Sequence, residues 1–387
     1  MNVAYIVDAV RTAGGRRNGK LASWHPVDLG AEVINALLDR TGIDPNVIDD
    51  AIFGCVTQAG EQTFAFARNI VLASKLPIHV PGVTIDRQCG SSQQAVQFAA
   101  QAILSGMQDV VIAGGVESMS RAPMLSNASL HAKAGLPADP LSPRIKARFD
   151  VDQFSQFTGA EMMAKKYGFD REQLDQYALL SHQRAIQATE TGNFENEIVV
   201  LDVDGEAHRI DEGIRFDANL ESVSGLKPLV ENGVVTAANA SQICDGASAV
   251  LIVSERALKA YDLTPKARLI HMSVSAGDPV MMLEEPIFAT QKALKKAGLK
   301  ITDIDLYEVN EAFAPVPLAW LQVLDANPEA LNIHGGAIAL GHPLGASGTK
   351  LMTTLIHALH TQGKRYGLQT MCEGGGMANV TILEACS

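Results

Sequence analysis

A cysteine with reactive potential stands at position 89, between a β-rich run and an alanine-rich run. We predict that a strand ends just before Cys89 and that a helix starts there. A thiol at a helix N-terminus lies near the positive end of the helix dipole and near free backbone N–H groups. Both lower the thiol pKa and favour the thiolate, and the same N–H groups can hold an oxyanion. Position alone leaves a second interpretation open, because cysteine is also a common residue of packed cores.

Three further segments carry residue types suited to acid–base or oxyanion chemistry. His342 lies in a Gly-His-Pro-Leu-Gly turn that can present an imidazole as a general base. Cys372 ends an apolar run shortly before three glycines, which let a ligand carbonyl approach backbone N–H groups. Asn310 opens an Asn-Glu-Ala-Phe-Ala segment at a predicted strand-to-helix corner, where its amide can fix a water or ligand oxygen. Each has an ordinary alternative: a solvated histidine, a small core residue and a helix cap.

The elements that must position these residues alternate between strand and helix. In the first third we predict strands at 3–7, 50–56, 83–87 and 109–113, the last ended by two glycines, and helices at 26–41, 62–76 and 89–104. In the last third we predict strands at 305–309 and 367–371 and helices at 289–297, 312–324 and 345–360. This alternation predicts α/β layers with strands buried on both faces. The shared order of turn, helix, strand and glycines indicates two duplicated halves.

The middle of the chain has a different texture. Residues 121–152 contain four prolines and little periodicity, and a helix is predicted at 171–191. We interpret residues 121–243 as a loop domain inserted into the α/β scaffold, since long excursions are more often functional than not. The N-terminal half then comprises residues 1–120 with about 244–265, and the C-terminal half comprises 266–387.

Composition excludes several classes of function. The net charge of the 387 residues is −12 and no run of Lys and Arg occurs, which argues against nucleic-acid binding. No stretch approaches the roughly 20 apolar residues of a membrane helix, so membrane insertion is not expected. Five widely spaced cysteines without a Cys-x-x-Cys pair predict neither a disulfide framework nor a metal site, which favours a cytoplasmic location.

Four blocks together resemble the thiolase family, which includes acetyl-CoA acetyltransferases and 3-ketoacyl-CoA thiolases. They are Cys89–Ser92, Asn310–Ala314, Gly335–Gly345 and Cys372 with its following glycines. The resemblance begins at residues 7–12 and covers essentially the whole chain. It implies the thiolase fold, in which two duplicated α/β halves form a layered α-β-α-β-α core and carry an inserted loop domain.

The resemblance also implies roles for individual residues. Cys89 is the nucleophile that becomes acylated, His342 takes its proton, and Cys372 is the second acid/base cysteine. The N–H groups of Cys89 and Gly374 form one oxyanion hole, and His342 with a water held by Asn310 forms the other. Two contacts with substrate or coenzyme A are further implied, at Ser241 and Phe313.

The implied activity is reversible acyl transfer between coenzyme A and a cysteine, with 3-ketoacyl-CoA thiolysis (acetyl-CoA C-acyltransferase) favoured. Coenzyme A is then a substrate, and no tightly bound cofactor or metal is expected. A biosynthetic acetoacetyl-CoA thiolase (acetyl-CoA C-acetyltransferase) is the alternative, and a silent acyl-CoA-binding protein is a minor one. A decarboxylating condensing enzyme is disfavoured by Cys372, and a nucleotide enzyme by the lack of a glycine-rich phosphate loop. The resemblance further implies a homodimer or homotetramer, with a fatty-acid oxidation subunit as a possible partner.

Some positions depart from the family pattern. His334 stands where an asparagine is usual, and Gln242 and Cys244 replace a usual glycine and asparagine. Residues 152–161 lack the Met-Gly pair of acetoacetyl-specific members. We therefore favour an acyl chain that is longer or bulkier than acetoacetyl.

Overall fold

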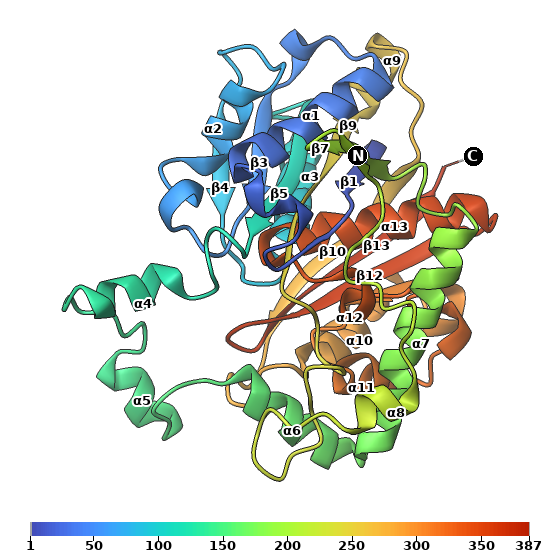
Figure 1. Ribbon diagram of the computed structural model, residues 1–387. Helices are drawn as coiled ribbons and strands as arrows, with labels where there is room; N and C mark the ends of the chain where they lie inside the picture. Colours follow the sequence, from blue (N-terminus) through green and yellow to red (C-terminus); the bar gives the residue numbers. More distant parts are fainter. Residues whose placement is uncertain (1, 387) are drawn as a thin grey trace.

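The computed structural model describes residues 2–386 and centres on an eleven-stranded β-sheet (Figure 1). Along its main path the strand order is β11-β12-β13-β10-β1-β9-β5-β3-β4, while β2 pairs with β9 and β6 with β1. The strands are β1 (Ala4–Thr12), β2 (Gly15–Arg16), β3 (Asp50–Gly54), β4 (Gly82–Ile85), β5 (Val110–Ser118), β6 (Ile198–Val199), β9 (Cys244–Ser254), β10 (Ala267–Ala276), β11 (Leu306–Val309), β12 (Tyr366–Glu373) and β13 (Met377–Ala385).

Two groups of strands meet at the middle of this sheet. On one side, β3 pairs in parallel with β4 and β5, and β9 lies antiparallel between β5 and β1. On the other side, β13 lies antiparallel between β10 and β12, and β11 pairs in parallel with β12. The groups join where β1 pairs with β10, at Tyr5 with Arg268 and Ile6 with Ala267.

Two helices lie between the strand groups. The helix α3 (Ser91–Ser105) contacts β3, β5 and β9 as well as β13, and α13 (Ser347–Thr361) contacts β1 and β9 as well as β12. They also contact each other, and a Cβ at Gly348 would overlap the backbone nitrogen of Gln93. The outer faces carry α1 (Pro26–Thr41), α2 (Phe66–Ala73), α9 (Glu255–Ala260), α10 (Glu285–Ala297) and α11 (Pro315–Leu324). The expected layered α/β architecture is therefore confirmed.

Local sequence explains why these helices form where they do. In α1, Leu29, Val33 and Leu37 recur at helical spacing and are fully buried. The helix starts with Pro26 after His25, whose ring accepts a hydrogen bond from the helix backbone, and it ends at Gly42 in the left-handed region.

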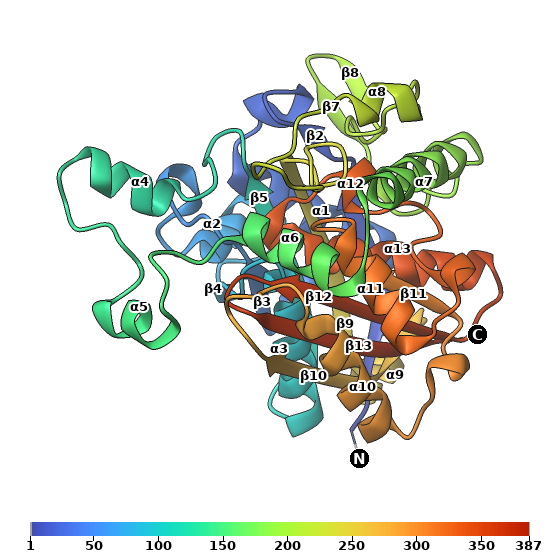
Figure 2. The ribbon, with the colours of Figure 1, turned by 90° about the horizontal axis from the view of Figure 1, so that it is seen from below.

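The segment between β5 and β9 leaves the layered core. It contains α4 (Ser126–Lys133), α5 (Pro143–Phe149), α6 (Gln156–Tyr167), α7 (Arg171–Glu190), α8 (Leu220–Ser224) and a small sheet of β7 (Leu201–Val203) and β8 (Glu206–His208). Figures 1 and 2 show α4 and α5 standing away from the rest of the chain. In contrast, α6 packs on α11, and α7 packs on the short helix α12 (Ala337–Leu340).

Three of the predicted boundaries that are wrong have a clear physical reason. β5 does not end at Gly114 and Gly115 but continues to Ser118; a Cβ at Gly115 would overlap the carbonyl of Gly345, so the glycines serve close packing. The helix predicted at 62–76 starts only at Phe66, after two left-handed residues. β12 extends to Glu373, which places Cys372 inside a strand rather than after one.

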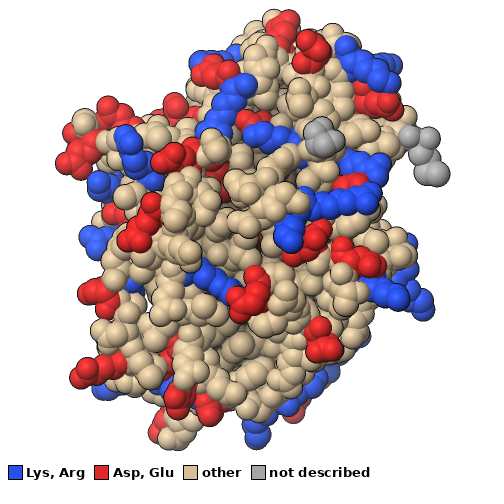
Figure 3. All heavy atoms as spheres, turned by 90° about the vertical axis from the view of Figure 1, so that its right-hand side faces the viewer, with Lys and Arg blue, Asp and Glu red and all other residues tan. Residues whose placement is uncertain are grey.

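On the side drawn in Figure 3, acidic and basic side chains are interspersed rather than gathered by sign. Across residues 2–386, no helix combines the length and apolar character needed to cross a membrane.

Candidate active site

Cys89 lies in a tight turn between β4 and α3. Gln88 adopts a left-handed conformation (φ 47°) that is uncommon for a residue with a side chain. The Ser91 hydroxyl holds this turn, because it accepts from the Arg87 N–H at 2.9 Å and donates to the Gln88 carbonyl at 2.6 Å. Gly90 caps α3, so Cys89 precedes the first helical residue by two positions. Such a fixed, strained turn is typical of functional sites.

The environment of the Cys89 thiol differs from the expectation of a lowered pKa. Burial raises the pKa of Cys89 to about 12, and the neighbouring Glu373 acts in the same direction. The N–H groups of Cys89 and Gly374 oppose this increase by donating toward the sulfur. In the free protein the thiol is therefore protonated, because desolvation outweighs the backbone donors. A base must remove its proton before it can attack.

Cys372 shares this environment. It is 1% exposed, and burial raises its pKa well above the ordinary value, with the neighbouring Cys89 as the next cause. The structure thus brings Cys89, Cys372 and Gly374 together at the end of β12. Cys372 is a protonated thiol at neutral pH and can serve as an acid.

His342 forms the centre of a second group. Its Nδ1 lies 2.5 Å from the Ser347 hydroxyl, which donates its own hydrogen to the Pro343 carbonyl at 2.9 Å. Ser347 can therefore only accept from His342, so Nδ1 carries the hydrogen and Nε2 is the free base. Burial lowers the pKa of His342 to about 3, which keeps the ring neutral at physiological pH.

Asn310 belongs to the same group as His342. Its amide nitrogen lies 3.4 Å from His342 Nε2, and its Oδ1 is buried without a hydrogen-bond partner among the described residues. The alternative of a helix cap is wrong, since α11 is capped by Ala314, four positions further on. A buried unpaired acceptor next to a base suits a site that holds a water or ligand donor.

The packing of α3 against α13 links the group of the two cysteines to the group of His342 and Asn310. The Thr349 N–H donates to the Ser92 hydroxyl at 3.0 Å, which ties the start of α13 to the start of α3. Glu117 accepts from the Gly345 N–H at 2.9 Å and from the N–H groups of Val56 and Thr57. Among residues 2–386, no hydrogen bond joins His342 directly to either cysteine.

Ser241 and Phe313 lie side by side but at some remove from these contacts. The Ser241 N–H donates to the Ala312 carbonyl at 2.9 Å, and Ala240 pairs with Phe313. The buried Phe313 ring meets Phe157 of α6 edge-on, with centroids 5.8 Å apart. These two residues therefore lie where α6 meets the core.

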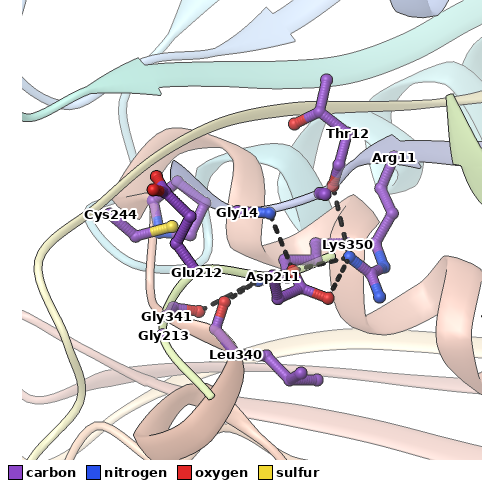
Figure 4. Close-up of polar contacts among 12 residues, drawn as sticks. Arg11, Thr12, Gly14, Asp211, Glu212, Gly213, Cys244, Leu340, Gly341 and Lys350 are labelled. Carbon is purple, nitrogen blue, oxygen red and sulfur yellow. Dashed lines mark hydrogen bonds and ion pairs between the residues drawn. The ribbon is translucent and has the colours of Figure 1, made fainter. Parts of the chain in front are cut away.

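The sequence analysis missed a buried ionic cluster behind the His342 turn (Figure 4). Arg11 donates to Glu197 at 2.5 Å and to Asp211 at 2.9 Å, and both of its partners are fully buried. Lys350 lies 3.8 Å from Asp211 and donates to the carbonyls of Leu340 and Gly341, directly before His342. The signal for this cluster was a charged residue inside each of two otherwise buried elements, Arg11 in β1 and Lys350 in α13.

The departures from the family pattern occupy packing positions around the same turn. The Gln242 amide donates to the carbonyls of Gly213 and Ile338, each at 2.7 Å. Cys244 packs so closely on Gly341 that a Cβ there would lie 2.6 Å from its sulfur. His334 meets the Phe194 ring edge-on with centroids 5.9 Å apart. No cluster of three or more potential metal ligands occurs in the described part of the chain.

Comparison with known families matches nearly the whole chain to two family models. Residues 4–256 match "Thiolase, N-terminal domain" and residues 263–385 match "Thiolase, C-terminal domain". The chain belongs to the thiolase family. This thiolase is 54% identical over 385 residues to the steroid 3-ketoacyl-CoA thiolase FadA6 of Mycobacterium tuberculosis, which covers 99% of this chain and 94% of that protein. It is 42% identical over 398 residues to a 3-ketoacyl-CoA thiolase of Shewanella loihica, covering 99% and 100%.

Solved structures agree with this assignment. The fold is similar to that of human mitochondrial 3-ketoacyl-CoA thiolase, with a TM-score of 0.91, 36% identity and 100% and 99% of the two chains covered. It is also similar to the acetyl-CoA acetyltransferase of Bacillus anthracis, with a TM-score of 0.90, 34% identity and the same coverage. The protein is thus an acyltransferase that catalyses 3-ketoacyl-CoA thiolysis, with coenzyme A as a substrate.

Proposed function

We propose that this thiolase works in the degradative direction on 3-ketoacyl-CoA substrates whose acyl part is bulkier than acetoacetyl, with Cys89 as the acyl acceptor. The observation that supports the acyl preference is the apolar contact between α6 and the core. Phe157 meets Phe313 there, and Gly159 lies against the backbone of Met281, next to Met282. Methionine side chains adapt to irregular apolar shapes, which suits a large acyl group. The relative FadA6 is named for a steroid 3-ketoacyl-CoA, which agrees with this preference.

In the first half-reaction, Nε2 of His342 takes the proton from Cys89, and the thiolate attacks the 3-keto carbonyl. The bond between Cα and Cβ then breaks, leaving the acyl group on Cys89 and acetyl-CoA as an enolate. Cys372 donates its proton to Cα of the enolate, which completes acetyl-CoA. The N–H groups of Cys89 and Gly374 hold the acyl-thioester oxygen, and His342 with a water on Asn310 holds the enolate oxygen.

In the second half-reaction, the Cys372 thiolate takes the proton from an incoming coenzyme A thiol. The coenzyme A thiolate attacks the acyl group on Cys89 and releases a shortened acyl-CoA. Cys89 leaves as a thiolate and recovers its proton from His342, so both cysteines return to their starting state.

The resting protonation states suit these roles. His342 is neutral with an unprotonated Nε2, while both cysteines are protonated because burial raises their pKa values. Thiolate formation on Cys89 is therefore coupled to substrate binding rather than permanent, which protects the thiol from side reactions.

Assembly and location form part of the same proposal. β4 ends the sheet and has β3 as its one neighbouring strand among the described residues, so its outer edge is open to a second copy. We infer a homodimer or homotetramer on this basis, with a fatty-acid oxidation subunit as a possible partner. All five cysteines are free thiols, which agrees with a reducing cytoplasm.

The test is thiolysis by the purified protein with free coenzyme A. Acetoacetyl-CoA is compared with linear 3-ketoacyl-CoA substrates of increasing length and with one whose acyl part is an alicyclic ring system. We expect kcat/KM to rise from acetoacetyl-CoA to the bulkier substrates. Activity confined to acetoacetyl-CoA would overturn the proposed acyl preference.

Two cysteine variants test whether Cys89 is the residue that becomes acylated. Cys89→Ala is expected to abolish both thiolysis and acyl-enzyme formation, which is read by intact-protein mass after incubation with an acyl-CoA. Cys386→Ala, a partly exposed cysteine near the chain end, is the matched control and is expected to retain both. Acylation of Cys89→Ala at the same stoichiometry would refute the assignment of the nucleophile.

A further inference from the structure

The carboxyl of Glu373 lies directly beneath the Cys89 turn. Glu373 is the last residue of β12 and is fully buried. A Cβ at Gly90 would overlap Glu373 Oε1, so the carboxyl fills the space that a side chain at the cap of α3 would take. Glycine at this position thus allows the acidic group to reach the backbone next to Cys89.

The carboxyl of Glu373 is poorly supplied with hydrogen-bond donors: the Asn379 N–H is directed at it and lowers its pKa, but it makes no hydrogen bond of normal geometry. Both Oε1 and Oε2 of Glu373 are buried without partners among the described residues. Oδ1 of Asn379, which would lie 2.9 Å from the same Cβ, is also unpaired. Three acceptors that share one poorly aligned N–H donor are unfavourable as long as Glu373 is ionised. A proton on Glu373 supplies a further donor.

Burial favours the neutral acid, although the one charge within residues 2–386 that acts on Glu373 opposes it. The Cys89 turn presents Asp86 and Arg87, β12 presents Cys372, and β13 presents the neutral Asn379 and Met377. Arg87 is the cation that acts on Glu373, yet its Nη1 is directed to the Met377 sulfur at 3.7 Å and its Nε is unpaired. Burial outweighs Arg87 and raises the pKa of Glu373 to about 8.

We propose that Glu373 is a positioning residue of the cysteine site: it is held as a neutral acid beneath Gly90, and its ionisation opposes thiolate formation on Cys89. The two groups lie close together in a desolvated part of the site, so the site accepts one negative charge more readily than a second. At neutral pH the charge goes to Cys89 when His342 takes its proton. At a pH high enough to ionise Glu373, the site already carries the negative charge of this carboxylate, and a thiolate on Cys89 becomes harder to form. The inference rests on the proposed role of Cys89 as nucleophile.

The test compares the pH dependence of Cys89 alkylation in the wild type and in Glu373→Gln. The glutamine amide keeps the shape of the neutral acid and can donate to Asn379, but it cannot ionise. Iodoacetamide is the probe, and peptide mapping reads Cys89 alone. Glu384→Gln is the matched control, because this carboxyl lies on β13 and pairs with Arg268 and Arg365 instead.

We expect equal alkylation rates in the two proteins at pH 6.5. At pH 9.5, Cys89 of Glu373→Gln should react about tenfold faster than in the wild type, the ratio that one unit of cysteine pKa produces. The control should follow the wild type throughout. Superimposable profiles would overturn the proposal, and so would a constant ratio at all pH values, since that would mean a permanent carboxylate.

A readout on the unmodified protein keeps the proposal testable if Glu373→Gln does not fold. Coupled titration requires the slope of log rate against pH to fall below one near pH 8 and to recover above it. An uncoupled thiol gives a slope of one throughout, which would contradict the inference. If Cys89 is not the nucleophile, peptide mapping finds no acyl group on Cys89 of the wild type; if only this inference fails, Cys89 is acylated and the alkylation profiles coincide.

Discussion

The hydroxyl of Ser347 determines which nitrogen of His342 is basic. The Ser347 hydrogen is directed to the Pro343 carbonyl, so the oxygen, 2.5 Å from Nδ1, acts as an acceptor and fixes the ring with Nε2 free. His342 lies in the turn between α12 and α13, and Ser347 is the first residue of α13, so the tautomer is a local property of this segment.

Ser347→Ala should lower kcat by about 10- to 100-fold with little change in KM, because the ring loses the acceptor that selects its tautomer. Steady-state thiolysis measures both constants. Ser105→Ala, at the exposed end of α3, is the matched control. An unchanged kcat in Ser347→Ala would show that the tautomer does not depend on this contact.

Cys372→Ala should separate the two halves of the reaction. Cys89 should still be acylated by a simple acyl-CoA, whereas carbon–carbon cleavage of a 3-ketoacyl-CoA should fall by at least about 100-fold, since the enolate loses its proton donor. Intact-protein mass measures acylation, and release of acetyl-CoA measures cleavage. Equal loss of both steps would contradict this division of roles.

Arg11→Met should lower the free energy of unfolding by about 3–5 kcal/mol, because it leaves Glu197 buried without its cation and Asp211 with Lys350 alone. Urea unfolding measures the change. Arg268→Met breaks a partly exposed pair with Glu384 and should cost about 0–1 kcal/mol. Similar values for the two variants would mean that the buried cluster does not stabilise the fold.

The protein should lose stability as pH falls from about 6.5 to 4. Burial lowers the pKa of His182 to about 4, and its Nδ1 accepts the Arg215 N–H at 3.2 Å, which requires the neutral ring. The unfolded chain then binds more protons than the folded one in this window, so His182 contributes a slope of up to about 1.4 kcal/mol per pH unit.

Urea unfolding of the wild type and of His182→Gln at several pH values tests this assignment. The free energy of unfolding of the variant should fall less steeply between pH 6.5 and 4 than that of the wild type. The difference between the two proteins at pH 7.5 gives the cost of losing the contact of His182 with the Arg215 N–H. Parallel curves for the two proteins would exclude His182 as a source of the acid sensitivity.

The sequence predicted the layers and the four catalytic candidates because both depend on local signals. Apolar spacing in α1 and the residue types at Cys89, His342, Asn310 and Cys372 can be read directly from the chain. The division into two halves and a loop domain, the residue roles and the contacts of Ser241 and Phe313 with ligand stay predictions.

What the sequence could not predict depends on contacts between distant segments. The pKa of Cys89 was expected to be lowered, but the packing of β12 against its turn raises it. Glu373 was missed because its position beneath Gly90 follows from the packing of the end of β12 against the start of α3. The glycines of β5 were interpreted as a strand end, although Gly115 makes room for the turn at Gly345 and Gly114 for the Ser248 carbonyl and the Phe53 ring.

The helices α3 and α13 come from opposite strand groups and meet in the middle layer. Cys89 precedes one of them and His342 the other, so neither group of strands carries a complete set of reactive groups. Catalytic turnover therefore reports whether the two groups of strands are correctly packed against each other within one chain. A destabilised variant whose strand groups separate by a small distance would lose thiolysis while its helical and sheet content stayed intact, and activity would detect such loosening before spectroscopy does.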